Sequence, residues 1–165
     1  MVLNDPQNYT LRLLSKAGYK LFQNSKKVTF TTPASRRGIP KLYTLSHAGK
    51  LLYVGIANQP MSGRLNSGFK AEGKGGYHGY KWKNLSHELQ LTIWTASSNN
   101  EYVSLREMET IEAEVAYLCR KNSGQWPEYQ HEIHFFPLPL LTEKRQREST
   151  FMQLDKQTNH FSLMR

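Results

Sequence analysis

Cysteine is nearly absent from this chain, and long apolar runs are missing altogether. Cys119 is the only cysteine in 165 residues, which excludes an intrachain disulfide and a cysteine-based zinc cage. No run of about 18 apolar residues occurs, so we expect no transmembrane helix and no membrane partner. The first residues lack the basic-then-apolar pattern of a signal peptide. A cytoplasmic location is therefore expected.

Acidic residues are scarce in the first half of the chain. The net charge is +9, and the segment from Lys26 to Lys83 contains eleven basic residues and one acid, Glu72. Such an asymmetric charge attracts a phosphate backbone, although a lysine-rich, solvated face that binds no nucleic acid has the same composition. We expect the following residues to contact the nucleic acid: Arg36, Arg37, Lys70, Lys74, Lys81 and Lys83.

The length and the 38% hydrophobic content suit a single domain with a real core, and no linker or repeat interrupts it. Apolar spacing predicts helices over 7–23, 60–69 and 77–85, and a helix over 105–121 that begins with the capping-box spacing of Ser104 and Glu107. Period-two runs predict strands over 28–31, 41–46, 51–56, 89–95 and 132–136, with a loop at 97–100. This order predicts an α+β fold in which a small antiparallel β-sheet is flanked by helices.

Two of the predicted strands carry a tyrosine each and form a hairpin, and an arginine follows them. Tyr43 lies in the first strand, Tyr53-Val54-Gly55 closes the second, and Arg64 comes nine residues after Gly55. This pattern resembles the GIY-YIG nuclease family, although Lys41 stands where the first motif has its glycine. The stretch that begins at Arg64 is similar to the Arg-Leu-Ser-Ser-Tyr-Phe segment of the UvrC excision nuclease.

The resemblance covers residues 38–135. It implies one GIY-YIG-like domain over 1–165, with its core at 38–135, a helical extension at 1–37 and a tail at 137–165. It also implies a DNA endonuclease that uses Mg²⁺, with Mn²⁺ as a substitute, and a homodimer like that of restriction enzymes in the family.

Hydrolysis of a phosphodiester needs a proton acceptor, a cation for the phosphorane and a carboxylate that holds the metal. By the resemblance, Tyr43 and Tyr53 activate or position water, and Arg64 engages the phosphate. His78 either assists proton transfer or contacts the phosphate. Gln130 stands where UvrC-like proteins have an asparagine, so it is the residue expected to orient its neighbours in the site.

Two glutamates on the last predicted helix compete for the metal. At about 100° per residue, Glu112 and Glu114 flank its apolar face on opposite sides, so spacing does not choose between them. The family's glutamate is followed by large apolar residues three and four positions later, as Glu114 is by Tyr117 and Leu118. The comparison favours Glu114 as the metal ligand, with Glu112 as the alternative.

The aromatic residues among the lysines at 74–83 have two readings. Tyr77, Tyr80 and Trp82 either stack on unpaired bases or pack inside the domain. The altered first motif and Gln130 also leave a second function open, in which the chain keeps the fold and binds nucleic acid without cutting it.

Overall fold

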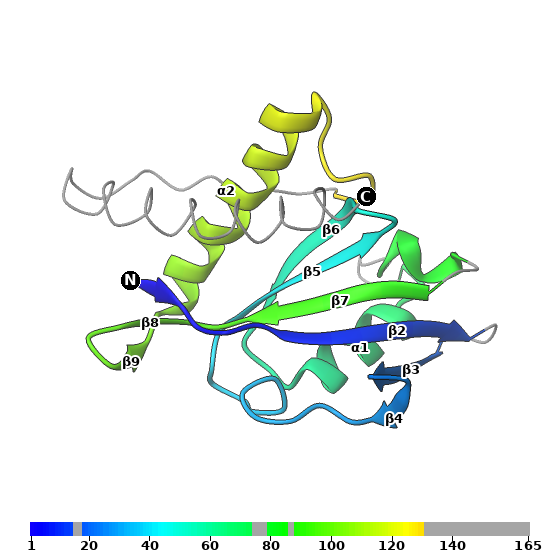
Figure 1. The fold of residues 1–165 in the computed structure, drawn as a ribbon, viewed down its shortest axis with the longest axis horizontal. Helices are drawn as coiled ribbons and strands as arrows, with labels where there is room; N and C mark the ends of the chain where they lie inside the picture. Colours follow the sequence, from blue (N-terminus) through cyan, green and yellow to red (C-terminus); the bar gives the residue numbers. More distant parts are fainter. Residues whose placement is uncertain (15–17, 74–78, 86–87, 131–165) are drawn as a thin grey trace.

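The computed structural model describes residues 1–14, 18–73, 79–85 and 88–130 (Figure 1). Its centre is a six-stranded antiparallel sheet in the order β4-β3-β2-β7-β5-β6. The strands are β2 (Gln7–Leu14), β3 (Gly18–Gln23), β4 (Lys26–Val28), β5 (Lys41–His47), β6 (Lys50–Ala57) and β7 (Glu88–Trp94). A smaller sheet joins β1 (Val2–Leu3), β8 (Ala96–Ser98) and β9 (Glu101–Tyr102) in the order β1-β8-β9.

The helices of the described residues cover both faces of the large sheet. They are α1 (Met61–Lys70), the short 3₁₀ helix η2 (Lys81–Asn84) and α2 (Leu105–Ser123). Because successive strand residues face opposite sides, neighbours in β5 enter different cores. Tyr43 packs with Met61 and Leu65 of α1, whereas Leu42 packs with Met108 of α2. The predicted α+β class is confirmed (Figure 1). None of the helices described is long and apolar enough to cross a membrane.

Several predicted elements are confirmed. The hairpin β5–β6, helix α1 and strand β7 lie within a few residues of their predicted bounds. Helix α2 begins with the predicted capping box, in which the Glu107 N–H donates to Ser104 Oγ and the Ser104 N–H donates to the Glu107 carboxylate. It ends at Gly124, whose φ of 76° suits a glycine cap.

The predicted helix over 7–23, and with it the helical extension at 1–37, is wrong. Residues 7–14 and 18–23 form β2 and β3, which pair antiparallel with each other, and β2 also pairs with β7. The apolar residues of this segment fit a helical stripe loosely, but Tyr9 and Leu11 are buried with exposed or half-buried neighbours between and after them. That period of two is the signature of a strand with one face in the core.

Three smaller predictions also need correction. The loop expected at 97–100 is the hairpin β8–β9, whose turn residues Asn99 and Asn100 have φ values of 52° and 64°. Both lie in the left-handed region that asparagine tolerates in hairpin turns. The strand expected at 28–31 is β4, at Lys26–Val28, and of the helix expected at 77–85 the described part holds only the four residues of η2. The strand predicted at 132–136 and the tail lie outside the described residues.

Candidate active site

The β5–β6 hairpin brings the two motif tyrosines together on one face of the sheet. Tyr43 pairs with Gly55 and Leu45 pairs with Tyr53, so both tyrosine side chains project to the same side. Their ring centroids lie 5.8 Å apart. A Cβ atom added to Gly55 would lie 2.7 Å from both the Tyr43 and the Tyr53 rings. Gly55 therefore leaves the space that the two tyrosine rings occupy, and any side chain at this position would displace them.

Arg64 is held by a closed ring of hydrogen bonds. Its Nε lies 3.3 Å from the Tyr43 hydroxyl, that hydroxyl lies 3.0 Å from the Tyr80 hydroxyl, and the Tyr80 hydroxyl lies 3.3 Å from the Arg64 carbonyl oxygen. A guanidinium only donates, a carbonyl only accepts, and each phenol has one proton. Arg64 therefore donates to Tyr43, Tyr43 donates to Tyr80, and Tyr80 donates back to the Arg64 carbonyl.

This ring changes the role that Tyr43 can play. The Tyr43 side chain is fully buried, and its proton is already donated to Tyr80. Burial, together with the neighbouring Tyr80, holds the Tyr43 pKa well above its usual value. A phenol that stays neutral does not accept a proton from water near pH 7. Tyr43 is thus placed to hold Arg64.

Arg64 itself remains a cation in this setting. Burial opposes its charge, but the oxygens of Tyr43, Tyr80 and Tyr53 outweigh burial and raise the arginine pKa. Its guanidinium carbon lies 5.8 Å from the centroid of the Tyr80 ring, a distance at which cation–π attraction adds to the hydrogen bonds. With Nε engaged by Tyr43, the two terminal nitrogens are the donors left for an anion.

Of the two alternatives for Tyr80 and Trp82, packing inside the domain is confirmed and stacking on bases is not. Tyr80 is 3% exposed and Trp82 is fully buried. Their rings stack at 4.4 Å, and a Cβ on Gly68 of α1 would overlap the Tyr80 ring. Tyr77, the third aromatic of that prediction, lies outside the described residues.

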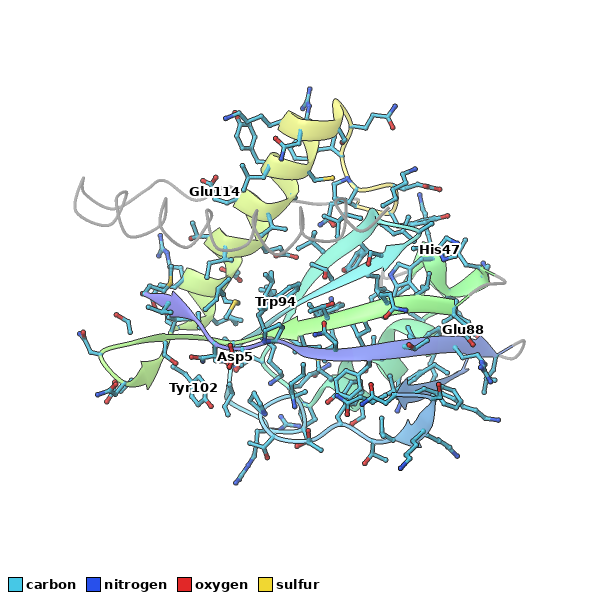
Figure 2. All side chains as sticks on the ribbon, in the orientation of Figure 1. Asp5, His47, Glu88, Trp94, Tyr102 and Glu114 are labelled. Carbon is cyan, nitrogen blue, oxygen red and sulfur yellow. The ribbon has the colours of Figure 1, made fainter. Side chains whose placement is uncertain are left out.

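Helix α2 brings Glu112 within electrostatic range of Arg64 and Tyr53. Glu112 is half-buried. Burial raises its pKa to about 7, against the opposing effect of Arg64, and Glu109 adds to the rise. Glu114 lies about 200° further round the helix, and Figure 2 shows it on the side of α2 away from β6. Of the two glutamates, the charge interaction with Arg64 favours Glu112 as the partner of the arginine.

Gln130 lies against the second motif strand. Its Oε1 accepts a hydrogen bond from the Val54 N–H at 3.1 Å, and the neighbouring Tyr129 N–H donates to the Leu52 carbonyl at 2.9 Å. Gln130 therefore fixes the backbone of β6 beside Tyr53. His78 and Lys74 lie outside the described residues.

The predicted basic contacts differ in how they are placed. Lys70 and Lys81 are exposed, as are Arg36 and Arg37 in the loop before β5. Lys83 instead donates to the carbonyls of Phe69 and Ala71, at 3.4 and 2.9 Å, and so caps the C-terminal end of α1.

Sequence reasoning did not identify the roles of Lys41 and the Tyr80 hydroxyl. Lys41 has no exposed surface, and its ammonium donates to the carbonyls of Arg36 and Ile39 at 2.8 and 2.5 Å. Burial lowers its pKa to about 8. Lys41, which stands in the place of the motif glycine, thus holds the preceding loop against β5 through these two hydrogen bonds. For Tyr80, the one available signal was Gly68 inside a predicted helix, because such a glycine often marks a close approach.

Among the described residues, Glu112 is the carboxylate whose charge interaction with Arg64 makes it the candidate ligand for a divalent cation. The described ranges contain no group of three or more histidine, cysteine, aspartate or glutamate side chains that could hold a metal. Mg²⁺ is commonly bound through one or two carboxylates, with water and substrate phosphate completing its shell. Glu112 fits that mode of binding.

Comparisons with known proteins give little beyond this geometry. No protein-family model and no curated protein sequence matches the chain. A solved structure described as the restriction endonuclease HPY188I in complex with product DNA aligns with 72% of this chain and 75% of its own. The identity is 13% and the TM-score 0.37. That score is too low for a conclusion about this chain.

Proposed function

We propose that this protein is a metal-dependent endonuclease that hydrolyses phosphodiester bonds of DNA with a GIY-YIG-like site. The observation that carries the proposal is the hydrogen-bond ring around Arg64, with Glu112 in range of the same guanidinium. A fixed arginine fork suits the charge that builds on a phosphorane, and a neighbouring carboxylate suits a divalent cation.

The proposed role of each residue in the site follows from its chemistry. Arg64 binds the scissile phosphate through its terminal nitrogens, while Tyr43 and Tyr80 hold its Nε and its backbone. Tyr53 keeps a raised pKa through burial and the adjacent Tyr43, so it positions the attacking water as a neutral donor or acceptor. In the reaction, water adds to phosphorus and one of its protons passes to a base. The bond from phosphorus to one sugar oxygen breaks, and that oxygen takes up a proton from solvent. His78 remains the residue expected to carry the proton of the water.

We assign the metal to Glu112, with Mg²⁺ as the expected ion and Mn²⁺ as a substitute. When bound, the ion would supply Lewis-acid stabilisation of the phosphate and the leaving oxygen. Glu114 remains the alternative ligand. Gln130 supports the site indirectly, through its hydrogen bond to the Val54 N–H.

A supercoiled-plasmid assay with Mg²⁺, with Mn²⁺ and with EDTA tests the proposal. Arg64→Ala and Glu112→Gln should abolish cutting, whereas Glu114→Gln, a matched change two residues along α2, should leave it. Loss in Glu114→Gln alone would move the metal to that residue. DNA binding without cutting under any divalent ion would mean that the protein is a binding module without nuclease chemistry.

A further inference from the structure

A cleft lies on the opposite flank of α1 from Arg64. It is lined by Leu14 at the end of β2 and by residues of β3, β4, the loop that follows β4, and α1, and its volume is about 620 Å³. That volume falls in the range of small-molecule sites, about 300–1,000 Å³. In Figure 1, β3 and β4 lie beneath β2, next to α1. The N-terminal strands thus build one wall of the cleft and the arginine helix builds the other.

The lining combines two aromatic rings and the aliphatic side chains of Leu14, Leu21 and Val28 with short polar side chains. Tyr19 and Phe30 are half-buried, and each also contacts a ring of the core, Phe69 and Tyr9 respectively. Ser62 and Asn66 line the cleft from α1. Flat rings beside an amide and hydroxyls suit a nucleobase, because a base offers a π-face for stacking and edges for hydrogen bonds.

The charge around the cleft selects a polyanion. From residue 6 to residue 71 the sequence contains no aspartate or glutamate, but eleven lysines and arginines. This segment supplies every residue that lines the cleft, including Lys20 and Lys27. A negatively charged strand meets no repelling carboxylate from this lining, and the lysines attract it.

Helix geometry connects the cleft to the proposed active site. Ser62 and Asn66 are four positions apart and share one flank of α1, whereas Arg64 lies about 200° from each. The exposed crest between these flanks carries Gly63 and Ser67, and a Cβ at Gly63 would meet nothing within 4 Å. A helix with its side chains is about 10–12 Å wide. A nucleic-acid strand bound at Arg64 can therefore cross the exposed side of α1 and reach the cleft within a few nucleotides.

We propose that the β3–β4/α1 cleft binds an unpaired nucleotide flanking the phosphate at Arg64, with its base on Tyr19 and Phe30 and its edge on Asn66. This inference rests on the proposed function. It makes the N-terminal strands, which lie outside the part of the chain that resembles the nuclease family, the element that selects the substrate.

The test measures anisotropy of a fluorescent single-stranded oligonucleotide and of its duplex, in EDTA so that no cutting occurs. Phe30→Leu should weaken single-strand binding about 5- to 100-fold, the usual range for loss of a stacked base. Asn66→Ala and Lys27→Gln should weaken it about 3- to 10-fold, and Lys27→Gln should lower the salt slope by about 0.7.

Two matched variants control for charge and for the helix surface. Lys26→Gln removes the same charge from the same strand, and Ser67→Ala changes the next exposed residue of α1, but neither residue lines the cleft. Each should weaken single-strand binding less than its counterpart in the cleft, Lys27→Gln or Asn66→Ala. Melting temperatures of all variants show which losses come from unfolding. Tyr19→Leu provides a second test of stacking if Phe30→Leu melts early.

The outcomes separate this inference from the proposed function. Weaker single-strand binding in the cleft variants than in their matched controls supports the cleft. Equal binding by cleft and control variants, or loss of duplex and single-strand binding by the same factor, overturns it while plasmid cutting stands. A parent protein that neither binds nor cuts nucleic acid overturns both.

Discussion

At the scale of single residues, the site depends on two hydroxyl groups that are removed from solvent. Tyr43 and Tyr80 use their protons within the ring that seats Arg64. The sequence motif predicted Tyr43 and Arg64, but not that they hydrogen-bond each other. Tyr80 could not be predicted, because its role depends on where η2 meets α1 in space. A spacing pattern contains no information about that distance.

Tyr80→Phe should lower kcat about 10-fold or more with little change in KM for DNA. The variant keeps the ring that packs on Trp82 and Gly68 but breaks the ring of hydrogen bonds, so Arg64 loses its fixed orientation where charge develops. The measurement is steady-state cleavage of a labelled duplex. Tyr9→Phe is the control, because Tyr9 is also buried but takes no part in the hydrogen bonds around Arg64. An equal fall of kcat in both variants would mean that Tyr80 only packs in the core and does not orient Arg64.

Glu112 should impose a pH dependence on cutting. Its pKa is raised to about 7, so the carboxylate that we propose as the metal ligand becomes protonated as the pH falls through that value. We expect the rate to fall about tenfold per pH unit below pH 7, and the metal concentration for half-maximal rate to rise. Rate profiles from pH 5.5 to 8.5 in Mg²⁺ test this. A flat profile would remove Glu112 from the metal site.

The Glu112 carboxylate should also lower the free energy of unfolding at neutral and higher pH. Because the pKa of Glu112 is higher in the folded than in the unfolded chain, the unfolded chain loses this proton at a lower pH. The free energy of unfolding therefore falls as the pH rises from about 4.5 to 7, and it stays lower above that range. Glu112→Gln removes this penalty. We expect the inactive variant to be more stable than the parent by about 1–3 kcal/mol at pH 8, measured by urea unfolding, with no gain at pH 4. A less stable variant at pH 8 would contradict the shift.

At the scale of elements, α1 contains two glycines with opposite requirements. Gly63 faces open space, whereas a Cβ on Gly68 would overlap the Tyr80 ring. Gly63→Ala should therefore stabilise the protein by about 0.5–1 kcal/mol, and Gly68→Ala should destabilise it by about 1–3 kcal/mol. Thermal melts of the two variants give the comparison directly. Stabilisation by both would mean that η2 does not pack on α1 as described.

Elements were predictable where one local signal dominated. The capping box fixed the start of α2, and the turn between two apolar runs fixed the β5–β6 hairpin. The helix predicted over 7–23 was wrong because the leucines fit both the 3.6-residue period of a helix and the two-residue period of a strand. Pairing with β7, about 80 residues away in the sequence, makes this segment a pair of strands. Glu112 and Glu114 could not be separated for a similar reason, since only the packed position of α2 tells which side faces Arg64.

At the scale of the whole molecule, one site per chain sets the products of cutting. A monomer would nick one strand, whereas the homodimer proposed by analogy with restriction enzymes would cut both strands. We expect a linear plasmid to appear together with the nicked form, with a ratio that rises steeply with protein concentration. Analytical ultracentrifugation with and without a short duplex gives the oligomeric state. A strictly monomeric protein that yields only nicks would contradict the dimer.

The ring around Arg64 also joins three segments that are far apart along the chain, at residues 43, 64 and 80. The arginine is therefore held in place only after the hairpin, α1 and the residue that precedes η2 have come together. For the proposed nuclease, a partly unfolded chain would keep its lysines but lack the assembled site around Arg64. We therefore expect cutting of DNA only from chains that have completed folding.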